Sequence, residues 1–452
     1  MIKAKRSVRV SELFAGPVRD FSIYNNQRMI PSIVDGFKPS QRKVIFGTLK
    51  KSSSIGATGI KVSQLANYIA EISAYHHGEG SLSGAIVGMA QDFPGSNNLN
   101  YLEPMGQFGS RLSPGAGADR YIFTRMMPVF RKIFPKDDDL ILEHLEDDGE
   151  KIEPKYYLPI LPNVLINGAD GMATGHATYI LQYNPEDLKK YITNVLREKR
   201  QMVHLTPWYR GYTGTVARSK ESNQVTITGK LEKVNSTTIK ITELPIGVWE
   251  DNYREYLNDL VDQGVIKDYN NESSVHGWSF TLTVPRTLGY ESDDTLYKIF
   301  KLTSRATENF TVWLPNGKIK CFDTAEELCD YFITFRLSKY ADRRAAKLKE
   351  LGEELFKLNE RLRFIRYYLA DNNAQKFSKR SKQEMRDTLA ELKYVLIDSL
   401  IEIPLYRLTK DEIEKLINDI ADVETMIKFY NDNDEKALYL IDLDALDVKD
   451  LK

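Results

Sequence analysis

The chain has 452 residues, enough for two to four domains, and its 42% hydrophobic content supports a buried core. No apolar run approaches the roughly 20 residues of a membrane-spanning helix, and the basic start lacks the apolar core of a signal peptide. We therefore expect a cytoplasmic protein. Two cysteines, Cys321 and Cys329, indicate isolated thiols rather than a disulfide or a zinc site.

The net charge of −1 conceals an uneven distribution of charge along the chain. Residues 1–136 carry 18 Lys and Arg against 8 Asp and Glu, a net charge of +10, so the remainder carries −11. A basic segment on a nearly neutral chain favours a polyanionic partner. Chance clustering of solvated charges is the alternative.

The basic segment has the pattern of a small helical module. After a helical arm over residues 1–30, apolar residues three and four apart predict three short helices, at Ser40–Lys50, Val62–Ala74 and Ser81–Phe93. Glycine and proline then dominate Pro94–Gly117, which predicts loops. Three short helices with a basic face suit a helix-turn-helix or winged-helix module.

The middle of the chain, residues 156–324, predicts a mixed α/β domain. Residues Gly214–Leu244 alternate β-branched and polar side chains, and Trp278–Val284 is a further strand. Between them Asp251–Gly264 is an amphipathic helix that ends on a glycine.

From about residue 325 the pattern becomes helical. Leucines and isoleucines three and four apart run from Leu348 to Leu369 and again from Ile413 to Tyr430. Two such helices predict an antiparallel coiled-coil arm. The apolar string LIEIPL, from Leu400 to Leu405, suits a self-association surface at its tip.

One short stretch carries a possible reaction centre. Arg120 and Tyr121 lie in GADRYIFT, directly after the glycine-rich run GQFGSRLSPGAG. A phenol oxygen can attack a phosphodiester, and a guanidinium offers a planar fork of donors to a phosphate. A surface arginine beside a half-buried tyrosine is the alternative.

The neighbouring motifs carry a family resemblance. In RMIPSIVDGFKPSQRKVIF, AYHHGEGSLSGAIVGMAQDF, PGSNNLNYLEPMGQFGSR and YYLPILPNVLINGADGMATGHATYI, the chain resembles the breakage-and-reunion region of type IIA DNA topoisomerases. It is most similar to the medium subunit of the T-even phage enzyme and to the eukaryotic enzyme, and less to the gyrase A subunit. The resemblance extends over nearly the whole chain.

The resemblance implies a catalytic group. Tyr121 matches the nucleophile that becomes joined to a 5′ DNA end, and Arg120 matches the stabiliser of the transition state. His77 matches a histidine near the scissile phosphate, and His76 precedes it as in the eukaryotic pattern. Tyr75 stands where the bacterial subunits have a second histidine. A structural loop histidine is the alternative for His77.

The resemblance also implies DNA contacts. Arg28, Lys38, Arg42 and Lys43 are expected to bind phosphates, with a solvated basic face as the alternative. Ile180 is expected to wedge between base pairs, although the family's ATYIPP ending is ATYILQ here. A core isoleucine is the alternative for Ile180.

The implied fold has four parts. They are an N-terminal arm (residues 1–30), a winged-helix domain with the catalytic tyrosine (31–155), an α/β tower domain (156–324) and a coiled-coil arm (325–452). The dimerisation tip of the arm is expected at about residues 373–408.

The implied function is that of a type II DNA topoisomerase subunit that acts on double-stranded DNA as a homodimer. The sequence has no GxxxxGK[ST] motif and no match to the family's ATPase or acidic Toprim elements. We therefore expect a large subunit to supply Mg²⁺ and ATP, the phage-type arrangement, in the host cytoplasm if the chain is phage-encoded. The alternatives are a non-catalytic architectural DNA-binding protein and a bacterial-type gyrase or topoisomerase IV A subunit.

Overall fold

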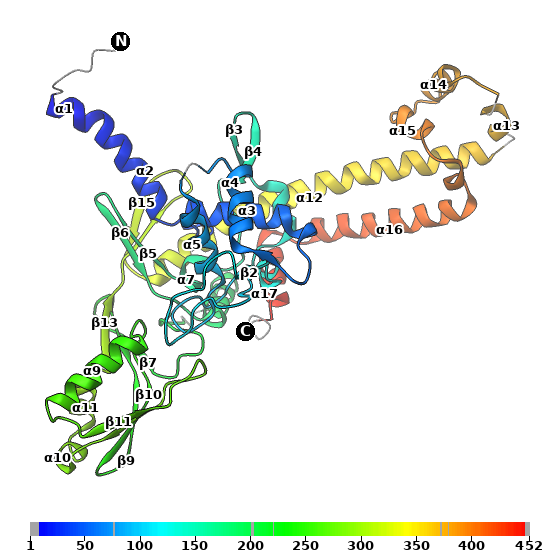
Figure 1. The fold of residues 1–452 in the computed structure, drawn as a ribbon. Helices are drawn as coiled ribbons and strands as arrows, with labels where there is room; N and C mark the ends of the chain where they lie inside the picture. The colour runs from blue at the N-terminus through cyan, green and yellow to red at the C-terminus, as the bar shows by residue number, and fades with distance from the viewer. Residues whose placement is uncertain are drawn as a thin grey trace. The chain divides into compact units, whose positions relative to one another are not determined.

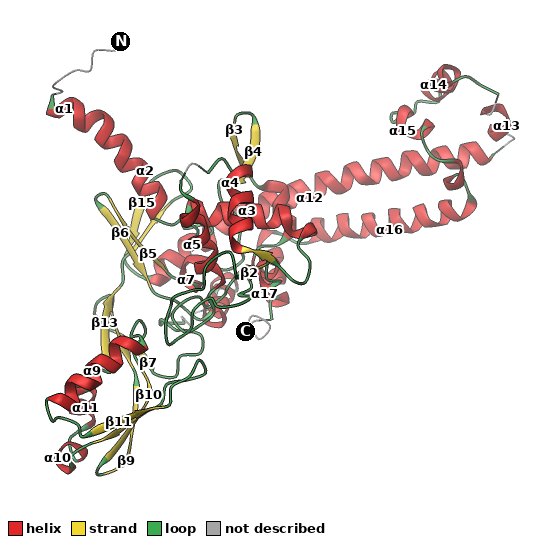
Figure 2. Cartoon of the chain, viewed as in Figure 1, coloured by secondary structure: helices red, strands yellow, loops and turns green. Residues whose placement is uncertain are grey.

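The structure is a computed structural model that describes residues 9–75, 77–199, 203–219, 221–370, 373–377 and 379–447. The fold is mixed α/β (Figures 1 and 2), as the sequence predicted. The chain forms two compact units. Described residues up to 136, from 142 to 336 and from 442 onward form the first unit, and residues 137–141 with the described part of 337–441 form the second.

The first unit begins with helices. They are α1 (Val10–Leu13), the π turn η1 (Phe14–Val18), α2 (Arg19–Met29), α3 (Pro39–Lys51), the 3₁₀ turn η2 (Ser52–Ser54), α4 (Val62–Ile72), α5 (Glu79–Ala90) and α6 (Val129–Ile133). Helix α3 begins at Pro39, where a missing N–H costs no helical hydrogen bond. Apolar residues at helical spacing, among them Val44, Leu65 and Leu82, are fully buried between α3, α4 and α5. The three helices therefore form where the sequence predicted them.

Short strands and loops complete this helical module. The strands pair antiparallel as β1 (Ile60–Lys61) with β2 (Phe123–Thr124), β3 (His144–Asp147) with β4 (Glu150–Pro154), and β5 (Ala169–Ala173) with β6 (His176–Ile180). The 3₁₀ turn η3 (Lys136–Ile141), α7 (Asn163–Ile166) and α8 (Pro185–Leu196) lie between or after them. Residues 94–117 form no helix and no strand beyond single bridges, in agreement with the predicted loops.

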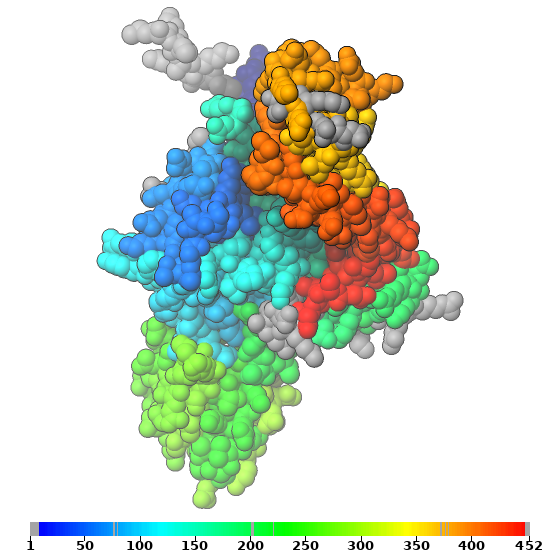
Figure 3. Space-filling model, turned by 90° about the vertical axis from the view of Figure 1, so that its right-hand side faces the viewer, coloured from blue at the N-terminus to red at the C-terminus, as the bar shows by residue number. Residues whose placement is uncertain are grey.

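An α/β lobe, defined as residues 230–302, follows the module (green in Figure 3). Its antiparallel sheet has the order β11–β12–β10–β9, from β9 (Lys230–Asn235), β10 (Thr238–Glu243), β11 (Asp268–Asn271) and β12 (Phe280–Thr283). Its helices are α9 (Glu250–Asp262), α10 (Arg286–Gly289) and α11 (Asp293–Ile299). Leu257, Phe280 and Phe300 belong to a core that the sheet shares with the helices.

Two smaller sheets border the α/β lobe in sequence. One has the order β13–β8–β7, from β7 (Thr215–Arg218), β8 (Gln224–Thr228) and β13 (Thr303–Thr307), and the other pairs β14 (Phe310–Trp313) with β15 (Ile319–Phe322). The strands predicted in residues 214–244 and 278–284 are confirmed.

The described residues of the second unit are helical and without strands. Its elements are most of α12 (Ala325–Leu369), α13 (Asn373–Phe377), α14 (Lys382–Glu391), α15 (Ile397–Ile401), the 3₁₀ turn η4 (Leu405–Arg407), α16 (Lys410–Asp432) and the start of α17 (Glu435–Ala445). Helices α12 and α16 run side by side (Figure 1), and Leu362, Ile365 and Leu416 pack between them. No described helix is long and apolar enough to cross a membrane.

Candidate functional site

Tyr121 lies in an exposed turn immediately before β2. Its ring is 72% exposed, whereas the next residue, Ile122, is 2% exposed and belongs to the core. Successive side chains of an extended segment point to opposite sides, so Ile122 anchors the segment while the Tyr121 phenol faces solvent. The hydroxyl is therefore accessible to a large substrate.

Hydrogen bonds from two helices hold the backbone of this turn. The Ser63 amide at the start of α4 donates to the Asp119 carbonyl at 3.2 Å, and the Val62 amide donates to the Ile122 carbonyl at 3.0 Å. From α5, the Ser83 hydroxyl donates to the Asp119 carboxylate at 2.8 Å. The accessible phenol therefore rests on a fixed support, which a positioned nucleophile requires.

The structure brings Arg120 and Tyr121 together. The guanidinium carbon of Arg120 lies 5.3 Å from the centroid of the Tyr121 ring, within the range of a cation–π contact. Arg120 is itself exposed. An anion bound at the phenol would meet a fixed positive charge.

His77 lies just before α5, the helix that contacts the tyrosine turn through Ser83. Its Nε2 is hydrogen-bonded to the hydroxyl of Tyr24 on α2, and its ring meets Tyr75 edge-on at 5.2 Å. Two tyrosines thus orient the imidazole, and the sequence did not identify Tyr24 as one of them. His76 lies outside the described residues, as do residues 1–8 of the predicted arm and Asp371, Asn372 and Ser378 near or within the predicted tip.

Lys38 and Arg28 flank α2 and α3. The Lys38 ammonium donates to the Asp170 carbonyl of β5 at 2.6 Å. Burial lowers the pKa of Lys38, and the nearby Asp170 carboxylate offsets only part of that effect. Arg28 lies half-buried in the last turn of α2. Both residues therefore remain candidates for phosphate contacts.

Arg42 and Lys43 lie in different surroundings from those that the sequence predicted. Arg42 is 7% exposed, and its Nε and Nη2 donate to the carboxylate of buried Asp35 at 2.7 and 3.0 Å. Lys43 is also largely buried and pairs with Glu153 at 2.8 Å. These internal ion pairs argue against the predicted phosphate contacts, because both cations already have buried anionic partners.

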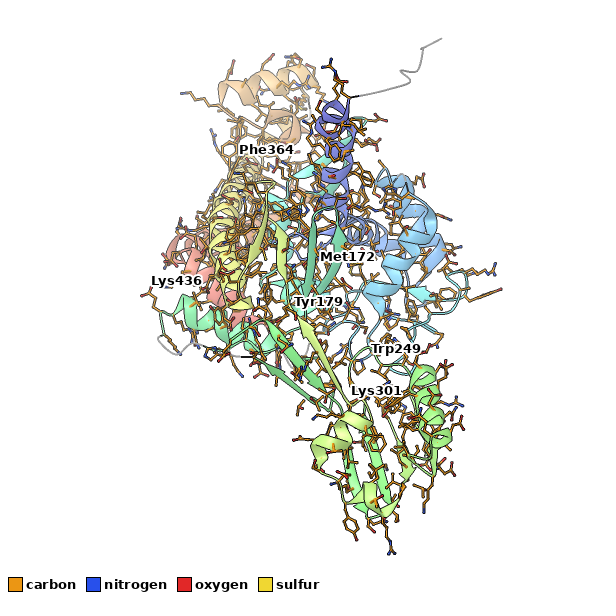
Figure 4. All side chains as sticks on the ribbon, turned by 90° about the vertical axis from the view of Figure 1, so that its left-hand side faces the viewer. Met172, Tyr179, Trp249, Lys301, Phe364 and Lys436 are labelled. Carbon is orange, nitrogen blue, oxygen red and sulfur yellow. The ribbon has the colours of Figure 1, made fainter. Side chains whose placement is uncertain are left out.

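The hairpin β5–β6 corrects the predicted wedge. Ile180 is 3% exposed, so it is a core residue. Met172 on β5 is 80% exposed, and its neighbours in register place it on the same face as Tyr179, which is also exposed (Figure 4). Because the side-chain period of a strand is two, Ile180 lies on the opposite face. Met172 is therefore the apolar side chain that this hairpin presents.

The hairpin is held against α2. The Asn26 side chain donates to the Thr174 carbonyl at 2.9 Å, and a Cβ on Gly171 would lie 2.2 Å from the Met29 carbonyl oxygen. Only glycine allows this approach. The hairpin, Arg28 and the Tyr24–His77 pair thus share a support in α2.

No metal site is formed by the described residues. They contain no group of three or more His, Cys, Asp or Glu side chains that could hold a metal ion. The Mg²⁺ that the resemblance implies therefore does not fit the described carboxylates of this chain.

The comparisons with known proteins agree on one family. The family model for the A subunit of DNA gyrase/topoisomerase IV matches residues 28–446. The chain is 45% identical over 356 residues to DNA topoisomerase 2 of Arabidopsis thaliana, covering 76% of this chain and 24% of that protein. It is 36% identical over 441 residues to the mitochondrial DNA topoisomerase 2 of Dictyostelium discoideum, covering 93% and 34%.

A solved structure agrees as well. The DNA-binding, cleavage and re-ligation domain of Plasmodium falciparum topoisomerase II matches with a TM-score of 0.87 and 32% sequence identity, over 96% of this chain and 63% of that chain. The chain therefore spans about a quarter to a third of the length of the two curated relatives above.

Proposed function

The chain belongs to the family of DNA gyrase/topoisomerase IV A subunits, and on that premise we propose that it binds, cleaves and religates duplex DNA. One observation carries the proposal. The accessible Tyr121 phenol lies beside the Arg120 cation on a turn that two helices hold in place.

The proposed reaction is a transesterification at Tyr121. The phenol oxygen attacks a backbone phosphorus and loses its proton, a Tyr–O–P bond forms, and the bond from phosphorus to the 3′ oxygen breaks. The 5′ end stays attached to the protein as a phosphotyrosine ester, and attack by the 3′ hydroxyl reverses the step. Because the ester conserves the bond energy, resealing requires no external energy source.

Arg120 and His77 are proposed to serve the same phosphate. The phosphorus becomes pentacovalent during attack and gains negative charge, which a fixed guanidinium offsets. An imidazole can hydrogen-bond a non-bridging oxygen in either protonation state, and the contact with Tyr24 holds its ring.

DNA binding is proposed to use Arg28, Lys38 and the β5–β6 hairpin. The two cations would position the backbone without reading the sequence. Met172 takes the wedge role that the sequence gave to Ile180, because an unstacking side chain must be apolar and exposed.

We interpret the fold in the terms of the family. The helical module is proposed to be a winged-helix domain, residues 156–324 with the α/β lobe a tower domain, and α12 with α16 a coiled-coil arm. A homodimer through the arm's tip is also part of the proposal, since two strands of a duplex require two tyrosines. The exposed Leu405 and Tyr406 at that tip support it.

Mg²⁺ and ATP are proposed to be bound by a large subunit with Toprim and ATPase domains, the phage-type arrangement. Bound Mg²⁺ would stabilise the departing 3′ oxygen. The proposal is supported by the motifs that the sequence lacks. The test is relaxation of supercoiled plasmid by this chain with and without such a subunit. Efficient relaxation by this chain alone would contradict the two-subunit arrangement.

Covalent trapping tests the central claim. Denaturant added during cleavage should capture a protein–DNA adduct with the natural chain and none with Tyr121→Phe, which removes one exposed hydroxyl. Both proteins should bind DNA equally. An architectural DNA-binding protein would give no adduct in either case, and an adduct with the variant would identify another nucleophile.

A further inference from the structure

The loop that precedes Tyr121, residues 106–117, is joined at its base to the segment that carries the tyrosine. Met105 and Phe123 exchange backbone hydrogen bonds of 3.1 and 2.9 Å, and the Gly117 amide donates to the Gln107 carbonyl at 2.8 Å. Gly106 adopts φ +112°, and a Cβ there would lie 3.2 Å from the Ile122 side chain. Movement of this base would therefore move the residues on either side of Tyr121.

The tip of the same loop is inserted against the α/β lobe. The Arg111 guanidinium donates to Glu243 Oε1 on β10 at 2.5 Å, and the two residues are 8% and 1% exposed. The other oxygen, Glu243 Oε2, accepts from the amide and hydroxyl of Thr213 at 3.1 and 2.8 Å. The carboxylate therefore has a fixed orientation, and the guanidinium of Arg111 is aligned by it.

Two further contacts flank this ion pair. The Glu250 amide at the start of α9 donates to the Leu112 carbonyl at 3.0 Å, and the Leu112 side chain packs against the core of the α/β lobe. Trp249, labelled in Figure 4, meets Phe93 edge-on at 6.1 Å. The helical module and the α/β lobe are thus connected by both polar and apolar contacts.

Helix α5 and the segment after it hold the loop from the other side. The Gln91 side chain donates to the carbonyls of Phe108 and Pro114 at 2.9 and 3.0 Å. The loop is therefore held by the same helix that bonds Asp119 through Ser83. A displacement of the loop tip has little room to be absorbed before it reaches the tyrosine turn.

We propose that Arg111 and Glu243 are positioning residues for Tyr121: their buried ion pair sets the tyrosine turn according to the position of the α/β lobe. A buried ion pair costs desolvation free energy, so apolar contacts alone would anchor the tip at least as well. What the pair adds is a unique direction, since the guanidinium fork matches the carboxylate in one orientation. The inference rests on the proposed function, because it assigns the purpose of the pair to DNA cleavage.

The test compares Arg111→Met, Glu243→Gln and the double variant in the full chain with its large subunit. Each single variant leaves one buried partner unpaired, so both stability and cleavage should fall. The double variant leaves no buried charge, so its melting temperature should recover toward that of the natural chain. Its cleavage rate at saturating DNA should remain reduced by about tenfold or more, as expected for a misplaced nucleophile. Cleavage that recovers together with stability would overturn the proposal.

Glu326→Gln is the matched control. Glu326 pairs with Arg218 at 3.3 Å in a similarly sheltered setting away from the loop. This variant should cleave at the rate of the natural chain. Equal loss of cleavage in the control and the double variant would show a general effect of removing ion pairs and would reject the positioning role.

A spectroscopic measurement on the chain alone separates this inference from the proposed function. With a fluorine label on the Tyr121 ring, the ¹⁹F resonance should shift or broaden in the double variant and stay unchanged in Glu326→Gln. An unchanged resonance in the double variant would reject the link between the ion pair and the tyrosine. If the natural chain formed no covalent adduct with its large subunit, the proposed function would fail, while the fluorine result would still test the link.

Discussion

Met172 and Ile180 lie on opposite faces of one β hairpin, the first exposed to solvent and the second buried in the core. Their register separates a side chain available to DNA from one that holds the hairpin in place. The two positions therefore make a matched pair for mutagenesis, because each substitution tests the role that the other should lack.

Met172→Ala should reduce DNA bending and cleavage while changing the free energy of unfolding by less than about 0.5 kcal/mol, as is usual for an exposed side chain. Ile180→Ala should cost about 2–5 kcal/mol, because it leaves a cavity in the core. Bending is measured by fluorescence transfer between the ends of a labelled duplex, and stability by denaturant unfolding. Normal bending with Met172→Ala would refute the wedge role.

Arg42→Ala should destabilise the protein rather than selectively weaken DNA binding. It leaves the buried Asp35 carboxylate without its cation, a change that typically costs about 3–5 kcal/mol. Lys50→Ala, at a less buried position of the same helix, is the control and should change stability little. At a temperature where both variants are folded, the slope of DNA affinity against salt should be unchanged by Arg42→Ala. A slope lower by about one phosphate contact would restore the DNA-binding role.

These corrections show where sequence patterns stop being informative. Helical spacing predicted α3, α4 and α9 because it reports directly which face of a helix is buried. It could not predict the partner of Arg42, since Asp35 lies seven residues earlier in a turn outside the helix.

The site shows the same limit. The adjacent Arg120 and Tyr121 were identified because their function needs only neighbouring residues. The contact between Tyr24 and His77 joins residues 53 positions apart, so it depends on the fold. Met172 was missed because the exposed face of a hairpin is known only once the strand register is known.

Lys38 should make DNA affinity sensitive to alkaline pH. Burial lowers its pKa, so the amine loses its proton at a lower pH than an exposed lysine does. A phosphate contact requires the charged form, and affinity should therefore fall as pH rises through that lowered pKa. Lys38→Arg keeps its charge over the same range and should flatten the profile, as measured by fluorescence anisotropy. Identical profiles for the two proteins would exclude a phosphate contact by Lys38.

Arg120→Lys should slow cleavage strongly while DNA binding falls only modestly. Lysine keeps the positive charge but loses the planar fork that can contact two phosphate oxygens at once. The rate of covalent adduct formation at saturating DNA is the measurement. An unchanged rate would leave Arg120 as a simple backbone contact rather than a stabiliser of the transition state.

The tip of the second unit should hold the homodimer together. Leu405 and Tyr406 are 79% and 73% exposed, although Leu400 and Tyr394 beside them in sequence are buried in the tip's own core. Exposed apolar side chains next to a well-packed core are typical of an association surface. Leu405→Glu with Tyr406→Glu should shift the mass measured by light scattering at micromolar concentration from dimer toward monomer. The melting temperature should stay the same at a concentration where both proteins are monomeric. As a control, Val234→Glu charges an exposed apolar position in the α/β lobe and should leave the dimer intact. A natural chain that is already monomeric, or a variant that remains fully dimeric, would place the dimer contact elsewhere or exclude it.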